Sequence, residues 1–286
     1  MAGQGGSAGP AHRPAIRRPA VTAPRTAPET APDTAPDTAM LLAAGLGTRM
    51  RPLTGAAPKP LLEVGGRTML DRTLDKALEA GVTRAVVNTH HLAAQIERRL
   101  KARTAPEIVI SHEAEILDTG GGVLNALGLL GEAPFFVLNS DTVWEDGPTP
   151  ALHRLAAAWD PARMDALLLV HPTVAATGYA GDGDFFMDIE GRLQRRGEAE
   201  IAPFVFTGSQ ILSPALFDGM APGAFSLNRV YDRALERERL YGIRHDGAWH
   251  HVGTPDGFAR VSLLYAHIAQ GEAAAPPAQA DLFDAG

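Results

Sequence analysis

Short apolar runs alternate with longer amphipathic stretches between residues 40 and 139. The apolar runs predict strands at Met40–Ala43, Ala85–Asn88, Glu107–Ser111 and Phe135–Asn139. The amphipathic stretches between them predict helices at Met69–Ala80, Leu92–Ala102 and Val123–Leu130. Alternation of strands and helices predicts an α/β fold, with a parallel sheet, right-handed crossovers and helices on both faces.

The pattern changes after Asp165, where strand-like runs follow one another more closely. We expect strands at Ala166–Val170, Phe185–Ile189, Arg192–Gln194, Phe204–Leu212 and Leu240–Arg244, with a hairpin turn at Asp188–Gly191. Ser226–Glu238 and Pro255–Gln270 predict two more helices. This half is expected to contribute antiparallel strands and to cover a ligand from the other side.

Both ends of the chain differ in composition from its middle. From Thr22 the sequence repeats as TAPR, TAPE, TAPD and TAPD, and a proline in every unit excludes a continuous helix or sheet ladder. We expect a disordered leader over residues 1–39, a folded domain over 40–270 with halves at 40–164 and 165–270, and a flexible tail over 271–286. A translation start at Met40 is an alternative explanation of the leader.

Composition narrows the class of protein. The 286 residues are 45% hydrophobic and 21% charged, which suits one α/β domain with a sizeable core. The net charge of −7 argues against nonspecific nucleic-acid binding. Absence of cysteine excludes disulfides, thiolate zinc sites and cysteine nucleophiles. No apolar run reaches about 18 residues and no signal-peptide core is present, so a cytoplasmic protein without a membrane span is expected.

A glycine-rich loop follows the first predicted strand, in the run LAAGLGTRMRPLT. Gly45 and Gly47 let the backbone bend closely around a ligand, with its N–H groups turned inward. Hydroxyl and cationic donors for a polyphosphate then come from Thr48, Arg49, Arg51 and Lys59. Met50 stands where a dinucleotide-binding fingerprint needs glycine, and no Walker A string occurs. A tight turn with exposed basic residues is the structural alternative.

Two further motifs follow along the predicted sheet. The strand ending in Asn139 delivers Asp141 to the ligand-binding edge, where a carboxylate suits Mg²⁺, although Asp141 could instead cap the next segment. The run DTGGG includes Gly120 and Gly121, which would let a base or ribose lie on bare backbone with N–H groups presented at a helix start. A plain helix entry capped by Thr119 is the alternative there.

The runs LAAGLGTRMRPLT with PKPL, DTGGG, NSD and WHHVGT occur in one order between Ala39 and Ala269. Together they resemble the sugar-1-phosphate nucleotidyltransferases. LDTGGG, NSDTVWED, GDF and TGSQILSPALFDG most resemble bacterial N-acetylmuramate-1-phosphate uridylyltransferases, with mannose-1-phosphate guanylyltransferases as the alternative. The resemblance implies a Rossmann-like, GT-A-like, mainly parallel mixed sheet with a small antiparallel sugar-binding part.

The resemblance also implies a reaction and its site. A nucleoside triphosphate, expected to be UTP, would react with a sugar-1-phosphate and release pyrophosphate with the help of Mg²⁺, in a monomer or small homo-oligomer. Arg49 and Lys59 would be catalytic. Nucleotide binding is expected from these two and from Ala43, Ala44, Gly45, Gly47, Thr48, Gly120 and Gly121. Sugar binding is expected from Asn139, Gly183, Asp184, Thr207 and Gly208, and metal binding from Asp141 and His251.

One position departs from the resembled family. His251 stands where the family usually has the aspartate that shares the metal, and imidazole is a poor ligand for the hard Mg²⁺ ion. His251 could contact phosphate, act through water, help to bind a softer metal or be structural. The departure also leaves open a catalytically silent nucleotide or sugar-phosphate sensor. A nucleotide-dependent oxidoreductase is a second alternative, although Met50 and Lys59 do not fit it.

Overall fold

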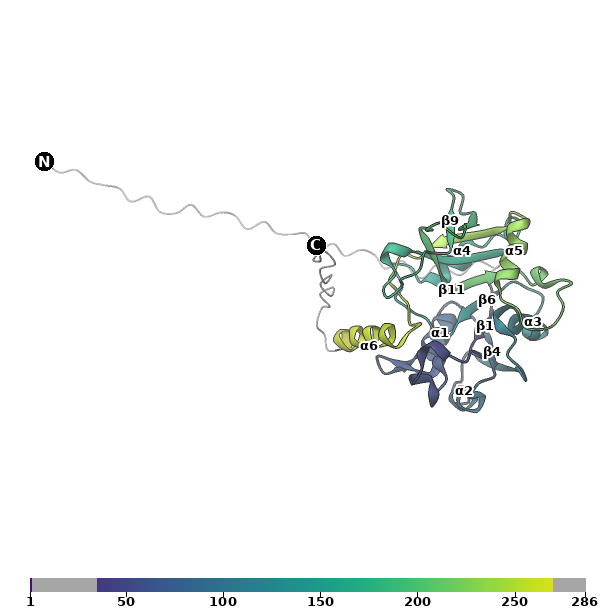
Figure 1. Cartoon of the computed structure of the whole chain (residues 1–286), viewed down its shortest axis with the longest axis horizontal. Helices are drawn as coiled ribbons and strands as arrows, with labels where there is room; N and C mark the ends of the chain where they lie inside the picture. Colours follow the sequence, from purple (N-terminus) through teal and green to yellow (C-terminus); the bar gives the residue numbers. More distant parts are fainter. Residues whose placement is uncertain (2–34, 270–286) are drawn as a thin grey trace. The chain divides into compact units, whose positions relative to one another are not determined.

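The computed structural model describes Met1 and residues 35–269. A nine-stranded mixed sheet forms the centre of this part of the chain (Figure 1). Its strands run in the order β10 (Leu193–Arg195), β9 (Phe185–Met187), β11 (Phe204–Leu212), β6 (Phe135–Asn139), β1 (Thr38–Leu42), β4 (Arg84–Thr89) and β5 (Glu107–His112). The remaining two strands are β8 (Ala166–Pro172), which pairs with β11, and β12 (Leu240–Arg244), which pairs with β8.

β1 lies between two parallel neighbours. Leu41 is opposite Val87 of β4 on one side and Leu138 of β6 on the other. β4 is in turn parallel to β5, whereas β11 runs antiparallel to β6. The carboxyl ends of β1, β4, β5 and β6 therefore lie along one edge of the sheet, which is where α/β proteins bind ligands.

Alternate residues of the strands support helices on opposite faces of the sheet. Leu41 belongs to the core on one face, which is covered by α1 (Met69–Glu79), α2 (Ala93–Leu100) and α4 (Ala151–Ala158). Met40 belongs to the core on the other face, which is covered by α3 (Asp118–Leu130) and α5 (Asn228–Glu236). The predicted α/β class, with helices on both faces of a mainly parallel mixed sheet, is confirmed.

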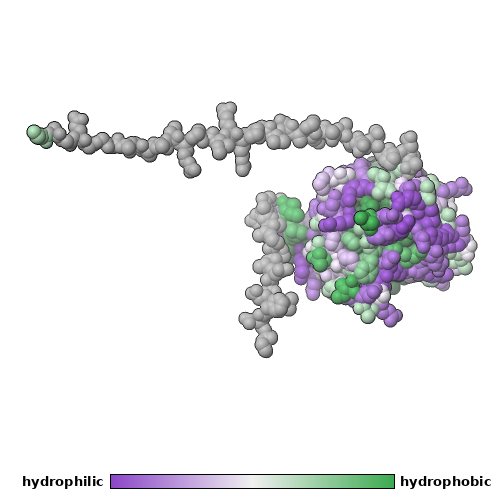
Figure 2. Space-filling view, turned by 90° about the horizontal axis from the view of Figure 1, so that it is seen from above, coloured by the Kyte–Doolittle hydropathy of each residue, from purple (hydrophilic) through white to green (hydrophobic). Residues whose placement is uncertain are grey.

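Smaller elements complete the described part. β7 (Val143–Trp144) pairs with β13 (Trp249–His250), and β2 (Glu63–Val64) pairs with β3 (Arg67–Thr68). Five 3₁₀ turns occur, namely η1 (Thr48–Met50), η2 (Leu53–Gly55), η3 (Lys59–Leu61), η4 (Thr173–Ala175) and η5 (Pro214–Phe217). α6 (Pro255–Ala269) is the last element, and none of the described helices has the length and apolarity that a membrane crossing requires. The surface seen in Figure 2 is largely hydrophilic, with apolar residues in small separate groups.

Three sequence-based boundaries or directions differ from the structure. β1 begins at Thr38, so residues 38 and 39, assigned to the leader, belong to the sheet because they pair with β4. The rest of the expected leader, residues 2–34, and the expected tail lie outside the described residues. α3 starts at Asp118 rather than at residue 123, because DTGGG is helical. β12 is parallel to β8 rather than antiparallel, because α5 carries the chain back before β12 begins.

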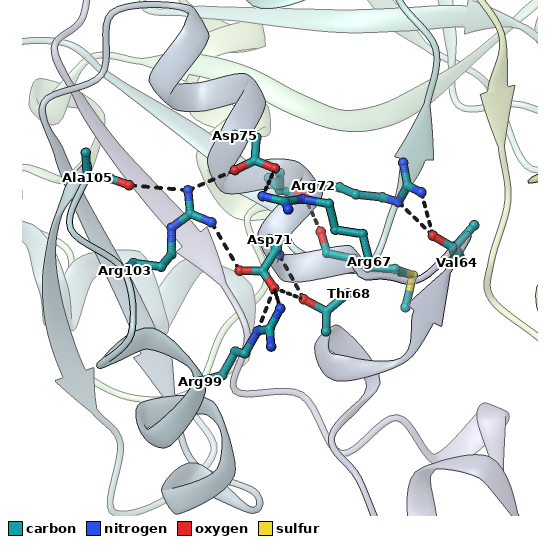
Figure 3. A network of polar contacts seen from close by, with 11 residues as sticks. Val64, Arg67, Thr68, Asp71, Arg72, Asp75, Arg99, Arg103 and Ala105 are labelled. Carbon is teal, nitrogen blue, oxygen red and sulfur yellow. Dashed lines mark hydrogen bonds and ion pairs between the residues drawn. The ribbon is translucent and has the colours of Figure 1, made fainter. Parts of the chain in front are cut away.

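A buried carboxylate holds α1 against α2 (Figure 3). Asp71 is 3% exposed and accepts hydrogen bonds from Thr68 Oγ1 at 2.7 Å, Arg99 Nε at 2.7 Å and Arg103 Nη1 at 3.1 Å. Burial by itself raises the pKa of Asp71, but these three donors outweigh burial and hold the pKa below its ordinary value. Because Met69 at the start of α1 donates its N–H to Leu62, this network also steadies the segment that follows Lys59.

We expect the substitution Asp71→Asn to lower the free energy of unfolding by about 2 kcal/mol, because it weakens the charge-assisted hydrogen bonds from Arg99 and Arg103, although Arg103 keeps Asp75 as a partner. The carboxylate pKa is lower in the folded state, so its contribution is present above the unfolded-state pKa and is lost as pH falls through the folded-state pKa. Urea denaturation at pH 7 and at acidic pH checks both points. Equal losses of stability at both pH values would contradict the assigned role of the charge.

Candidate nucleotide and sugar-phosphate site

A cavity of about 400 Å³ opens at the carboxyl ends of the parallel strands. Its wall is formed by the loop after β1, the segment around Lys59, and the ends of β4, β5 and β6. The lining residues are Leu42, Ala43, Ala44, Gly45, Leu46, Gly47, Thr48, Arg49, Met50, Lys59, Pro60, Asn88, Glu113, Ile116, Asp118, Thr119, Asn139, Asp141 and Gly253. Nine of the residues predicted from the sequence therefore share one cavity: Ala43, Ala44, Gly45, Gly47, Thr48, Arg49, Lys59, Asn139 and Asp141.

The glycine-rich loop is shaped by its second glycine. Gly47 has a φ of +60°, and a Cβ there would lie 3.0 Å from Thr54 Cγ2 and 3.2 Å from Lys59 Cβ. Thr54 Oγ1 donates to the Gly47 carbonyl at 2.8 Å, which fixes the turn from inside. Glycine is thus required both by the backbone conformation and by the close approach of the lysine segment. At Gly45 an added Cβ would meet no atom within 4 Å.

Lys59 and Asp141 meet across the cavity although 82 residues separate them in sequence. Lys59 Nζ lies 2.7 Å from Asp141 Oδ2, and the two side chains are 11% and 35% exposed. Arg49 is exposed and lines the same cavity. The structure thus brings Arg49, Lys59 and Asp141 together in one cavity, as the reaction expected from the sequence requires. Their arrangement could hold a group with several negative oxygens, with both cations on the ligand and the carboxylate facing a metal ion.

Only a small protein ligand set is available for a metal. Across residues 35–269, no group of three or more histidine, aspartate or glutamate side chains is arranged to hold one. Mg²⁺ does not need such a group, because it commonly uses one or two carboxylates and completes its shell with water and phosphate oxygens. Asp141, partly exposed at the cavity wall, fits that pattern.

His251 lies beside this charged group but is not among the residues that line the cavity. Its ring packs edge-on against Tyr179, with ring centres 5.9 Å apart, and at a tilt against Trp249, with ring centres 5.8 Å apart. Burial lowers its pKa, the positive charges of Lys59 and Arg49 lower it further, and Asp141 opposes them. These effects together favour the neutral form of the His251 imidazole.

The DTGGG segment has a different role from the one expected. The N–H groups of Gly120 and Gly121 both donate to the Phe225 carbonyl, at 2.8 and 3.0 Å, so the expectation that these N–H groups are presented to a ligand is wrong, whereas nucleotide binding by the two residues stays a prediction. A Cβ on Gly121 would lie 2.2 Å from the Gly223 carbonyl oxygen, which shows that packing against this neighbouring loop requires glycine. The two residues that precede the glycines, Asp118 and Thr119, do line the cavity.

Two buried polar residues of the cavity lining were not assigned a role from the sequence. Asn88 is the second-last residue of β4 and Glu113 directly follows β5, and they are 3% and 2% exposed. Their signal was available, because polar residues at the carboxyl ends of parallel strands mark the ligand-binding edge. The sequence pattern places Asn88 at the end of a predicted strand and indicates no role for either residue.

The predicted sugar-binding residues fall into two groups. Gly208, with a φ of +92°, lies against Asn139, since a Cβ there would be 2.8 Å from Asn139 Nδ2. Thr207 is adjacent, and its carbonyl accepts a hydrogen bond from Trp249 Nε1 at 3.0 Å. Gly183 and Asp184 do not line the cavity and bond within their own half. The Gly183 carbonyl accepts from Arg196, and Asp184 Oδ2 accepts from the Phe206 N–H at 2.8 Å.

Comparison with known proteins places the chain in a family. The nucleotidyl transferase family pattern matches residues 38–181. The N-acetylmuramate alpha-1-phosphate uridylyltransferase of Caulobacter vibrioides is 44% identical over 76% of this chain and 91% of that protein. The protein of the same name from Neisseria meningitidis serogroup B is 35% identical over 75% of this chain and 92% of its own. A UDP-glucose pyrophosphorylase crystallised with UDP-glucose has the same fold, with a TM-score of 0.67, 17% identity and coverage of 81% and 99%. The chain belongs to the nucleotidyl transferase family, and the resemblance to sugar-1-phosphate nucleotidyltransferases drawn from its motifs is confirmed.

Proposed function

We propose that this protein transfers uridylyl from UTP to N-acetylmuramate-1-phosphate, forming UDP-N-acetylmuramate and pyrophosphate for peptidoglycan recycling. The observation that carries the proposal is the meeting of Arg49, Lys59 and Asp141 in one cavity beside the glycine-rich loop. Similarity to two uridylyltransferases over nine tenths of their lengths supports the choice of substrates. Because the reaction uses a nucleoside triphosphate, the cytoplasm is the proposed location.

In the proposed reaction, an oxygen of the sugar phosphate attacks the α-phosphorus in line with the departing pyrophosphate. One phosphorus–oxygen bond forms, another breaks, and the electron pair leaves with pyrophosphate. The nucleophile is already anionic, so no side chain must remove a proton. Lys59 holds the α-phosphate and sugar phosphate together against their repulsion, and Arg49 holds the β- and γ-phosphates. Catalysis is then mainly positioning and charge stabilisation.

Asp141 is the proposed Mg²⁺ ligand, together with phosphate oxygens and water. The bound ion would neutralise charge on the phosphates and draw the reacting oxygens together. In the free protein the carboxylate is paired with Lys59, so both side chains exchange partners when the phosphates enter. In the free protein the pKa of His251 is lowered by burial and by Lys59 and Arg49, and we propose that the imidazole lies close to the bound phosphates.

A matrix of nucleoside triphosphates against sugar-1-phosphates, read by pyrophosphate release, tests the proposed substrates. We expect UTP with N-acetylmuramate-1-phosphate to give the highest kcat/KM. Preference for GTP with mannose-1-phosphate would replace the proposal with the guanylyltransferase alternative. Calorimetric binding of a nucleotide without turnover of any sugar phosphate would establish the sensor alternative instead.

We expect the substitution Lys59→Met to lower kcat by about 10²-fold or more. The reason is that it removes one preorganised positive charge that stabilises the transition state. Lys101→Met is a matched control, because Lys101 is an exposed lysine at the end of α2, remote from the cavity lining. Steady-state rates of both variants at saturating substrates provide the measurement. A normal kcat in the Lys59 variant would remove this residue from the catalytic machinery.

The metal role of His251 is tested by His251→Asp. A carboxylate is a better ligand than imidazole for a hard cation, so we expect the ratio of the rate with Mg²⁺ to the rate with Mn²⁺ to rise several-fold. His251→Gln, which keeps a neutral polar side chain, serves as the control. An unchanged ratio and rate in the aspartate variant would make His251 a structural residue.

A further inference from the structure

Asn88 and Glu113 form a buried hydrogen-bonded relay between two loops of the cavity. The Ala43 N–H donates to Asn88 Oδ1 at 2.6 Å, and Asn88 Nδ2 donates to Glu113 Oε1 at 2.7 Å. The other carboxylate oxygen, Oε2, accepts from the Leu117 N–H at 3.1 Å. Ala43 begins the glycine-rich loop, and Leu117 lies between Ile116 and Asp118, which both line the cavity.

The relay fits this place closely. A Cβ on Gly122 would lie 2.7 Å from Glu113 Oε1 and 2.8 Å from Asn88 Nδ2, so the first turn of α3 packs directly on the two side chains. Among residues 35–269, Glu113 has no ion-pair partner. A buried carboxylate without a cation is unfavourable unless its oxygens are hydrogen-bonded. The presence of a carboxylate at Glu113 therefore depends on the hydrogen bonds that it accepts.

The order of donors and acceptors explains why asparagine and glutamate occur together here. The relay ends at two backbone N–H donors, those of Ala43 and Leu117. Residue 88 must therefore offer an acceptor to Ala43, and residue 113 must offer one to Leu117. Where the two side chains meet, one must donate and the other must accept. Asparagine followed by glutamate satisfies this order. An Asn–Gln pair would force two donors together, and an Asp–Glu pair would force two carboxylates together. The reversed pair, aspartate at 88 and glutamine at 113, satisfies it equally well.

We propose that Asn88 and Glu113 are positioning residues that fix the distance between the glycine-rich loop and the start of α3, and thereby the width of the nucleotide part of the cavity. This inference rests on the proposed function, since the cavity must bind a nucleoside triphosphate. A change at either single position displaces the backbone at Ala43 or Leu117, because Asn88→Asp sets two carboxylates against each other and Glu113→Gln sets two donors against each other. Small displacements of substrate-positioning groups have large effects on binding and rate.

The test is a four-member series: the native chain, Asn88→Asp, Glu113→Gln, and the double variant with both changes. We expect each single change to raise the KM for UTP and weaken its calorimetric Kd about tenfold, in line with one unpaired buried group. The double variant should return to within about twofold of the native KM.

Asn125→Asp is the control for an added charge, because Asn125 is an exposed residue of α3 outside the cavity lining, and it should keep the native KM. The inference would be overturned if the single variants had the native KM and Kd for UTP, whatever their melting temperatures. It would also be overturned if the double variant had a KM for UTP as high as the single variants. If a single variant does not fold, recovery of both folding and native KM in the double variant still decides the matter. Failure of the native chain to bind any nucleoside triphosphate would instead refute the proposed function.

Discussion

The site depends on the position of β1 between two parallel strands. Because β4 and β6 both run in the same direction as β1, three strand ends deliver their following residues to one edge of the sheet. The glycine-rich loop, Asn88 and Asp141 are neighbours for this reason alone. An antiparallel partner on either side of β1 would have placed one of these groups at the opposite edge. The chemical properties of the cavity therefore depend on the parallel direction of these three strands.

The charges of Lys59 and Asp141 compensate each other before any ligand enters. Lys59 is paired with Asp141 at 2.7 Å, and its limited exposure makes this contact more significant than a surface ion pair. Arg49 stays exposed at the cavity wall, where it is available to an incoming anion. A nucleoside triphosphate brings more negative charge than one lysine can neutralise. The proposed exchange, in which phosphates take Lys59 and a metal ion takes Asp141, keeps the charges of these two side chains compensated.

The second half of the chain supports the cavity through aromatic packing rather than through a separate sheet. β11 extends the same sheet beside β6, so Gly208 comes to lie against Asn139. Trp249 donates to the Thr207 carbonyl and contacts the ring of His251. A change at β13 would thus be felt both at the turn after β11 and beside the charged group. His251 is held in place by ring packing against Tyr179 and Trp249.

The α/β class, the central strands and the chemical character of the glycine-rich loop can all be predicted without coordinates, because they follow from local periodicity and from conformations that few residues adopt. The sequence also predicted that Arg49, Lys59 and Asp141 belong together, through the resemblance of its motifs. Tertiary structure decided what depends on contacts between distant residues. The glycines of DTGGG pack against residues 223–225, which the sequence does not indicate. The positions of Asn88 and Glu113 near strand ends can be read from the sequence, but the hydrogen bond that joins their two loops cannot. A residue's neighbours across the sheet are set by strand order, which periodicity along one chain does not encode.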